Sequence, residues 1–345
     1  MSKPEHWRRD EPTFYNFLAL DRRPQDAPDA LEGLNGALMS RDPRHGAHTW
    51  VMELPKGWSS RTDATLASLE FFVLRGQLAL DGQVVGCGGY VHMPQLCGGG
   101  ELRSESGALV LAFWNPDIPA YPYPVTRNRA VESFALDWTN SMPGAHGVMH
   151  KSLRLPDAVP HPIDEGFDGG PGGYLRLQFI APHMIAELEH VHHECWEEII
   201  LLQGDVMLLN EGQMGIGSVV GHPQEWYHAP FVSRSGCVIL VHTDAPMGYP
   251  WPPRPYPQGR ELCQDYLRNA PWDVPTEHVP WSEHPLQPQQ EASAEYQQWR
   301  STEEGSLWGG YEKTERVPFK PGGRGTASEY RASWSRCKGH DHDRG

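Results

Sequence analysis

The sequence predicts an all-β protein that contains two similar β domains. Between residues 46 and 245, segments rich in β-branched and other apolar residues alternate with Gly- or Pro-containing turns about every 8–12 residues, which is typical of a sandwich or barrel. Examples are LEFFVLRGQLAL, GALVLAF, YLRLQFI, EEIILLQGDVMLL and GCVILVH. An internal repeat is the second observation, and it indicates that the β unit is duplicated.

The repeat is found when LEFFVLRGQLAL is aligned with EEIILLQGDVML. Its anchors lie 128 or 129 positions apart and are the pairs Gly76 and Gly204, Pro94 and Pro223, and Gly107 and Gly236. The spacing from the proline to the second glycine is the same in both copies. We therefore expect two copies of one β domain.

The expected organisation follows from these segments and from the Pro-rich and polar stretches around them. We predict an N-terminal arm of irregular chain with a short helix at 28–38 and, after residue 246, an irregular polar extension that contains a helix near 289–299. The predicted units are an arm (1–45), a first β domain (46–120), a linker (121–165), a second β domain (166–245), and a Pro- and Trp-rich extension and tail (246–345).

Composition excludes several classes of protein. The formal net charge is −15, from 29 Lys and Arg against 44 Asp and Glu, so the surface repels phosphate backbones and nucleic-acid binding is not expected. The apolar runs are shorter than the roughly 18 residues that a membrane helix needs, and the N-terminus lacks the apolar core of a secretory signal. The six cysteines show no CxxC spacing. We expect a cytoplasmic protein with reduced thiols.

The second β domain carries a candidate metal site. His190 and His192 are two positions apart, so on a strand their imidazoles project from the same face. Glu197 begins the next predicted strand, and His228 lies on a later one. Three imidazoles and one carboxylate suit a divalent first-row metal and leave open positions on an octahedral ion.

These residues resemble the two motifs of the cupin superfamily. The first motif is His190-x-His192-(x)4-Glu197-(x)6-Gly204, and the second is Gly217-(x)5-Pro223-(x)4-His228. Turn or support positions depart from the family pattern at Met184, Glu225 and Val232. The resemblance implies two tandem cupin barrels, each a double-stranded β-helix or jelly roll, over residues 46–245. It also assigns His190, His192, Glu197 and His228 as the metal ligands.

The first copy lacks these ligands. By the same spacings, Thr62, Ala64, Leu69 and Gly99 stand at the four ligand positions, and none offers an imidazole or a carboxylate. We therefore expect a degenerate, metal-free N-terminal cupin. His92 lies nearby, where a hydrogen-bonded histidine is the expected state.

Other polar and aromatic residues near the motifs have two interpretations each. Tyr227 and His242 are candidate catalytic bases, and the alternative is packing or, for His242, solvent. His193 and His222 are expected to face solvent or to support the ligands, and Cys195 to be an inert buried thiol. The candidate substrate-pocket residues are Arg176, Gln178, Met184 and Trp226.

The leading hypothesis for function is a metal-dependent oxygenase, with Fe(II) favoured and Mn, Ni, Cu or Zn as alternatives. It is expected to act on a small organic molecule that chelates through two oxygens, with O2 as co-substrate and a homo-oligomeric assembly. Two further classes stay open, because a fold does not set a function. One is a redox-neutral cupin lyase, isomerase, hydrolase or decarboxylase, and the other is a non-catalytic cupin that senses a metal or ligand.

Overall fold

The regular structure of the protein consists almost wholly of β-strands, which confirms the predicted all-β fold. Short 3-10 helices occur at η2 (Phe17–Ala19), η3 (Asp29–Leu31) and η4 (Ser133–Ala135). The computed structural model describes residues 8–10, 12–25, 27, 29–43, 46–62, 67–95, 99–116, 127–140, 147–154, 175–185, 195–208, 212–224, 226, 228, 231–244 and 264. The predicted helix near 289–299 lies outside them.

The N-terminal barrel is formed by two antiparallel sheets that pack face to face around one apolar core. Its seven-stranded sheet has the order β12 (Arg129–Glu132), β9 (Gly89–Met93), β6 (Ser68–Gly76), β11 (Ala108–Asn115), β4 (His48–Leu54), β3 (Asn35–Arg41) and β2 (Arg23–Pro24). Its four-stranded sheet has the order β5 (Trp58–Thr62), β10 (Gly100–Ser104), β7 (Leu78–Leu80) and β8 (Gln83–Val85).

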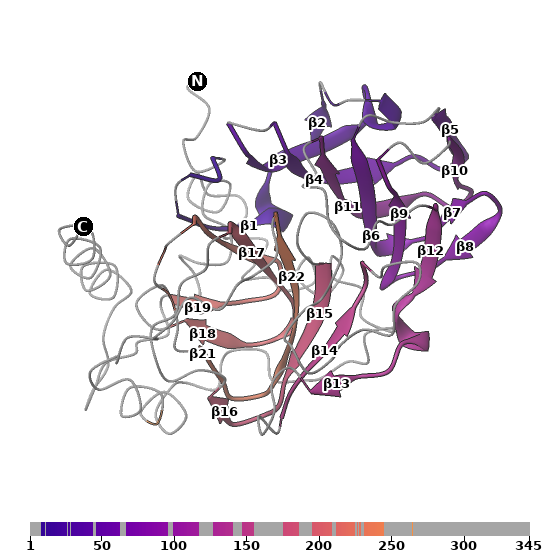
Figure 1. Ribbon diagram of the computed structural model, residues 1–345. Helices are drawn as coiled ribbons and strands as arrows, with labels where there is room; N and C mark the ends of the chain where they lie inside the picture. Colours follow the sequence, from indigo (N-terminus) through magenta and orange to yellow (C-terminus); the bar gives the residue numbers. More distant parts are fainter. Residues whose placement is uncertain are drawn as a thin grey trace, which may run out of the picture.

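The C-terminal barrel is built in the same way around a second core. Its seven-stranded sheet has the order β1 (Thr13–Asn16), β20 (Ser218–His222), β17 (Glu197–Gly204), β22 (Cys237–Thr243), β15 (Leu175–Ile180), β14 (Val148–Ser152) and β13 (Thr139–Asn140). Its four-stranded sheet has the order β16 (Met184–Ile185), β21 (Phe231–Ser233), β18 (Val206–Leu208) and β19 (Gly212–Met214). The two barrels lie side by side (Figure 1).

The edge strand of the C-terminal seven-stranded sheet comes from the opposite end of the chain. β1 precedes the whole N-terminal barrel, yet it pairs with β20 of the C-terminal sheet, with Thr13 opposite Gly221 and Asn16 opposite Ser218. Figure 1 shows the indigo β1 among the pink and orange strands of that barrel. The N-terminal segment is therefore part of the C-terminal sheet and not a separate arm of irregular chain.

The anchors of the sequence repeat occupy equivalent places in the two barrels. Gly76 and Gly204 have φ angles of +79° and +80°, and a β-carbon on either would overlap the carbonyl oxygen of Gly107 or Gly236 respectively. Each of the two long strands also has a bulge two residues before its glycine, at Leu74 and at Leu202. Glycine is needed here because the backbone is left-handed and a second backbone crosses above it.

Replacement of Gly204 by alanine should therefore lower the free energy of unfolding by far more than the strain of a left-handed alanine alone would. Gly82→Ala is the matched control, because Gly82 has φ +83° and no atom lies within 4 Å of the place that an added methyl group would take. We expect a loss of about 1–2 kcal/mol for Gly82→Ala and of about 3 kcal/mol or more for Gly204→Ala in the free energy of unfolding by urea. Equal losses would contradict the steric argument.

The predicted helix at 28–38 is wrong. The segment contains only the turn η3 and then enters β3, which pairs along its length with β4. Gly33 has φ +72°, which interrupts a right-handed helix, and at Gly36 a β-carbon would collide with Met52. Pairing with β4 thus outweighs the local preference of the alanines and leucines around it.

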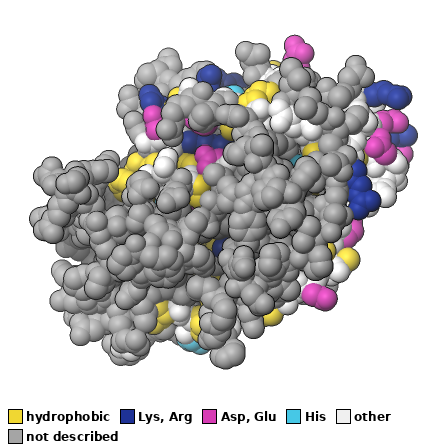
Figure 2. All heavy atoms as spheres, viewed as in Figure 1, with side chains coloured by type: hydrophobic (Ala, Val, Ile, Leu, Met, Phe, Trp, Pro, Cys, Tyr) yellow, Lys and Arg dark blue, Asp and Glu magenta, His cyan; other side chains and the backbone are white. Residues whose placement is uncertain are grey.

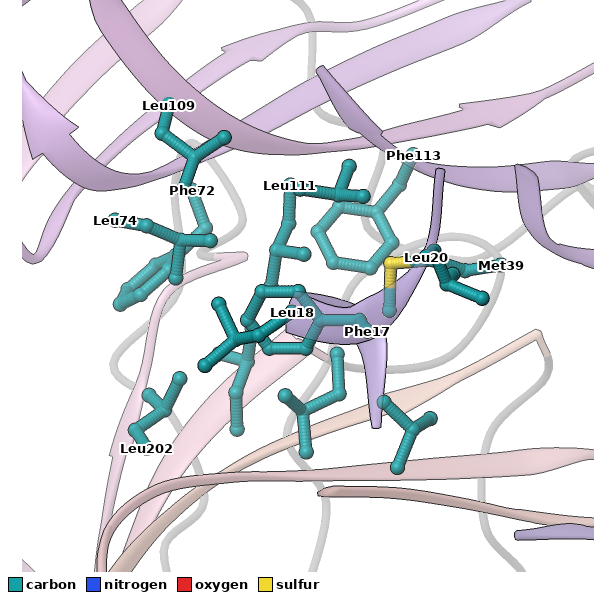
Figure 3. Packing of buried hydrophobic residues seen from close by; sticks show 14 of the residues in the cluster. Phe17, Leu18, Leu20, Met39, Phe72, Leu74, Leu109, Leu111, Phe113 and Leu202 are labelled. Atoms are coloured by element: carbon teal, nitrogen blue, oxygen red, sulfur yellow. The ribbon is translucent and has the colours of Figure 1, made fainter. Parts of the chain in front are cut away.

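A third core joins the barrels, because the central strands are buried on both faces. Along β6 and β17, alternate residues point into their own barrel, and the residues between them point into the layer between the two seven-stranded sheets. Figure 3 shows Phe17 and Leu18 between Phe72 of the N-terminal sheet and Leu202 of the C-terminal sheet. Complete burial of each such side chain stabilises the fold by about 1.5–3 kcal/mol.

The layer between the sheets also contains a buried ion pair. Arg154 donates to both oxygens of Glu70, at 2.6 and 3.0 Å, and the Tyr90 hydroxyl donates to the same carboxylate. Burial alone would raise the pKa of Glu70, but the charge of Arg154 and these hydrogen bonds keep it below its usual value. The pair joins β6 of one barrel to the chain that follows β14 of the other.

Breaking this pair from one side should be costly. Arg154→Met leaves a buried carboxylate without its cation, so we expect the free energy of unfolding to fall by about 3–5 kcal/mol. The double variant Glu70→Leu and Arg154→Met should recover most of that loss, because two apolar side chains carry no desolvation penalty. Urea titrations of the three proteins test this, and a double variant no more stable than Arg154→Met would contradict it.

The surface of the described residues carries both signs of charge. On the face in Figure 2, Lys and Arg side chains alternate with Asp and Glu side chains over the N-terminal barrel. Among the residues that the structure describes, there is no helix with the length and hydrophobicity that crossing a membrane requires.

Candidate metal centre

Glu197 faces the interior of the C-terminal barrel because of its position in β17. Ile199 and Leu201, which share its face by strand alternation, pack in the core of that barrel, whereas Ile200 and Leu202 pack between the two sheets. The Glu197 side chain is buried, with only 5% of the residue exposed. A carboxylate is thus held inside an apolar barrel, where it needs cationic or hydrogen-bonding partners.

His222 lies directly across the strand pair from Glu197. The register of β17 and β20 places the two residues opposite each other, so their side chains project from the same face. The Nδ1 atom of His222 is 3.2 Å from Oε2 of Glu197, and the imidazole is buried. The strand register alone brings these two groups together.

His228 reaches the same oxygen from the chain between β20 and β21. Its Nε2 atom is 3.3 Å from Oε2 of Glu197, and its ring stacks on that of His222 with centroids 4.1 Å apart. Nδ1 of His228 is 3.2 Å from the carbonyl oxygen of Trp226, to which it can donate. That hydrogen bond leaves the lone pair of Nε2 directed at the centre, which is the tautomer that a metal ligand requires.

The three side chains form a donor set for a divalent metal ion. One ligand atom from each of Glu197, His222 and His228 lies within 4.8 Å of the other two, and all three residues are buried. Two imidazoles and a carboxylate suit a first-row transition metal. Among the described residues this is the group of His, Cys, Asp and Glu side chains that can hold such an ion.

The structure therefore brings together two of the four predicted ligands and adds a third residue. Glu197 and His228 lie together in this group, whereas His190, His192 and Tyr227 lie outside the described residues. His222 was expected only to face solvent or to support the ligands. The sequence feature that points to His222 is its place at the end of β20. That feature identifies His222 as a ligand only when the register of β20 against β17 is known.

Two predicted pocket residues lie on the barrel-facing side of β15. Arg176 and Gln178 alternate with Leu175 and Leu177, which pack between the sheets, so the polar pair points into the barrel. Arg176 pairs with Val241 of β22, and Glu197 pairs with Thr243 of the same strand. Val241 and Thr243 are two residues apart, so they and their partners project from the same face. Arg176 and Glu197 therefore share one face of the sheet.

The remaining candidates are distributed around the barrel. Met184 lies on β16, where it packs against the C-terminal core, and Trp226 is buried and presents its carbonyl oxygen to His228. Cys195 is buried and forms no disulfide. Met184 and Trp226 thus border the barrel interior, while the backbone of Trp226 supports the imidazole of His228.

His242 lies on the opposite face of the sheet from the metal centre. Its ring centroid is 4.5 Å from that of Phe113, in the layer between the barrels, and its Nδ1 atom is 3.6 Å from Oε2 of Glu198. Burial, followed by the charges of Arg9 and Arg154, lowers the pKa of His242 well below its usual value. The structure does not bring this residue into the centre, because a one-residue step along a strand reverses the side-chain direction.

Glu198 shares that opposite face. Burial raises its pKa to about 7, and the charge of Arg9 acts in the other direction. Adjacent carboxylates in the chain thus have different surroundings: Glu197 meets two imidazoles inside the barrel, and Glu198 meets the N-terminal segment between the barrels.

The equivalent place in the N-terminal barrel is apolar. Leu69 and Met93 are opposite each other in β6 and β9, as Glu197 and His222 are in β17 and β20, and both pack in the N-terminal core. The Thr62 hydroxyl is 3.5 Å from the carbonyl oxygen of Gly100, and Nε2 of His92 is 2.9 Å from the Ser68 hydroxyl. His92 is hydrogen-bonded, as the sequence predicted.

Solved structures resemble the overall fold of this chain. A candidate dioxygenase from Nostoc punctiforme matches with a TM-score of 0.54 and 17% identity, over 70% of this chain and 88% of its own. A cupin 2 conserved barrel domain protein from Leptotrichia buccalis has a TM-score of 0.44 and 10% identity, over 67% and 94% of the two chains. The values for a salicylate 1,2-dioxygenase from Pseudaminobacter salicylatoxidans are 0.46 and 10%, over 68% and 84%.

The chain has the cupin jelly-roll fold. No family model matches its sequence, and no curated protein matches it. Glu197, His222 and His228 converge inside the C-terminal barrel of this fold.

Metal binding by the cupin barrel can be tested at the residue that the sequence motifs did not assign. We expect His222→Gln to weaken the binding of a divalent metal at least about tenfold, because it removes an imidazole from the donor set and from Glu197. His92→Gln, at a buried histidine of the other barrel, should bind as the wild type does. The measurement is competition with a chromophoric chelator, and unchanged affinity in His222→Gln would contradict the assignment.

Proposed function

We propose that the protein is a metal-dependent cupin enzyme, and specifically an oxygenase that uses Fe(II). The observation that carries the proposal is the buried group of Glu197, His222 and His228. A two-histidine, one-carboxylate set that leaves open positions is typical of non-haem Fe(II) oxygenases. The fold match to a candidate dioxygenase supports the same choice.

The proposal includes residues that lie outside the described part of the chain. The cupin motifs imply His190 and His192 as ligands in place of His222, because all of these imidazoles together with Glu197 and His228 would leave a single open position on an octahedral ion. Tyr227, beside His228, is a candidate catalytic base. The proposed architecture is a bicupin in which only the C-terminal barrel binds metal, since apolar Leu69 and Met93 occupy the equivalent place in the N-terminal barrel.

The proposed substrate is a small organic molecule that binds through two oxygens. Electron transfer to O2 beside a chelated substrate is the chemistry that a bound Fe(II) ion would supply. Arg176 lies on the barrel-facing side of β15, on the same face as Glu197, and its guanidinium attracts carboxylate or phenolate oxygens. Gln178, one alternation further along that strand, offers an amide for a substrate hydroxyl.

The protein's own side chains contribute the remaining functions of the site. The Trp226 carbonyl oxygen holds the imidazole of His228 in one orientation, so the ligand lone pair is preorganised. Ile199, Leu201 and Val220 pack in the apolar core on the same face of the sheet as Glu197 and His222, where apolar side chains exclude water. Exclusion of water strengthens each electrostatic contact with the substrate.

The test is O2 consumption by protein that has been loaded with Fe(II) under anaerobic conditions. We expect O2 uptake that matches the loss of one member of a panel of phenols, diketones and thiols, and no uptake by Glu197→Gln loaded in the same way. Arg176→Gln should raise KM for an anionic substrate about tenfold or more, with a smaller change in kcat.

The other classes are distinguishable outcomes of this experiment. Turnover with Zn(II) and without O2 would contradict the oxygenase and favour a redox-neutral cupin enzyme. Metal and ligand binding without any turnover would favour a sensing protein. Homo-oligomerisation is a further part of the proposal, and sedimentation of the purified chain tests it.

A further inference from the structure

The N-terminal segment reaches the strands that carry the metal centre. β1 pairs with β20 up to Gly221, the residue immediately before His222. A β-carbon on Gly221 would lie 2.6 Å from the Thr13 hydroxyl oxygen, so the absence of a side chain there lets the segment approach. The strand that begins the chain therefore borders one of the candidate ligands.

Arg9, just before β1, extends this contact to the strand of Glu197. Its guanidinium carbon lies 4.1 Å from the ring centroid of Trp196, and Trp196 immediately precedes Glu197. Arg9 is 4% exposed, and desolvated stacking of a guanidinium on an indole is worth about 2 kcal/mol. The contact lies behind the sheet, on the face opposite to the Glu197 carboxylate.

The other side of Arg9 is fixed to the N-terminal barrel. Its Nε and Nη2 atoms donate to the hydroxyl oxygens of Ser40 and Thr49, at 3.3 and 3.2 Å, and its backbone N–H donates to the carbonyl oxygen of Arg41 at 2.9 Å. A single buried side chain thus connects strands β3 and β4 of one barrel to the start of β17 in the other.

The backbone of the segment that Arg9 contacts is held separately from its side chain. Trp196 and Asp244 exchange hydrogen bonds, from the Trp196 N–H to the Asp244 carboxylate at 3.0 Å and from the Asp244 N–H to the Trp196 carbonyl at 3.3 Å. The indole itself meets the ring of His242 edge-on, with centroids 5.7 Å apart, and takes the Arg9 guanidinium on its face. The orientation of the indole depends on these two contacts. The rotation of the chain about its own axis where it enters β17 depends on them as well.

We propose that Arg9 is a positioning residue for the metal centre. By holding Trp196 against the N-terminal barrel, it keeps the start of β17 in the orientation that directs the Glu197 carboxylate at His222 and His228. The inference rests on the proposed metal-binding function of that group. It assigns the metal-free barrel a role in the site of the other barrel.

The repeat supplies a matched control for this role. Glu70 is 128 positions before Glu198, and it is paired with Arg154 as a buried contact between the same two barrels. The residue before Glu70 is Leu69, in the apolar N-terminal core, whereas the residue before Glu198 is Glu197. Arg154 thus joins the barrels as Arg9 does, but without a candidate ligand beside its contact.

The experiment compares Arg9→Lys with Arg154→Lys in the full chain. Both variants keep the charge and lose the planar guanidinium, so both should lower the urea midpoint. We expect only Arg9→Lys to raise the dissociation constant for Co(II) by about tenfold or more and to shift the visible absorption bands of bound Co(II). Arg154→Lys should leave the dissociation constant within about twofold and the bands in place.

A milder variant covers the case in which Arg9→Lys does not fold. Thr49→Val removes one acceptor of the Arg9 guanidinium within the N-terminal barrel, and it should raise the Co(II) dissociation constant by a smaller factor in the same direction. Equal dissociation constants in wild type, Arg9→Lys and Thr49→Val, or equal increases in Arg9→Lys and Arg154→Lys, would overturn the positioning role. A wild-type protein that binds no divalent metal would instead overturn the proposed function.

Discussion

The register between β17 and β20 is the constraint on which the metal centre depends. It places Glu197 opposite His222 on the barrel-facing side, and a slip of one residue would turn Glu198 inward instead. The two carboxylates have different environments, so the slip would put a different set of groups around the inward-facing carboxylate. Glu197 meets two imidazoles, whereas Glu198 lies between the barrels, where burial raises its pKa to about 7. Strand pairing thus decides whether Glu197 and His222 can share a metal ion.

On its other side, β17 pairs with β22, and that pairing has features that the two barrels share. Both long central strands have a bulge two residues before a left-handed glycine, and in each barrel a second backbone crosses over that glycine. These features leave little freedom to slide one strand along another. Burial on both faces adds to this, because a slip would expose or bury the wrong half of each strand. The duplicated architecture maintains the same register where Glu197 faces His222 and where the apolar Leu69 faces Met93.

The layer between the barrels shows how the N-terminal barrel contributes to the molecule. Phe17 and Leu18, from the start of the chain, fill the space between the two sheets, while β1 completes the sheet of the C-terminal barrel. Two arginines cross the layer, one beside Glu70 and one beside Trp196. The polar contacts lie at strand ends and the apolar contacts at strand centres. The N-terminal barrel thus supports the back of the sheet whose front carries the candidate ligands.

Local pattern was sufficient for much of the fold. Period-two alternation and the turn glycines predicted strands, and the spacing of Gly76 and Gly204 predicted the duplication of the sequence, because these signals lie within a few residues of each other or recur along the chain. The same approach failed at 28–38, where alanines and leucines favoured a helix but pairing of β3 with β4 prevailed. It also placed β1 in an irregular arm, since pairing with a strand about 200 residues away leaves no local signal.

The sequence by itself determined the all-β class and the repeat, and the motif spacing predicted that Glu197 and His228 belong to one site, because that spacing encodes which residues follow each turn. Only the tertiary structure decided that His222 joins them, that His242 faces the other way, and that Arg9 contacts the strand of Glu197. The physical reason is that each of these outcomes depends on how strands distant in sequence are paired and which face they bury, and that is fixed by the packing of the whole molecule.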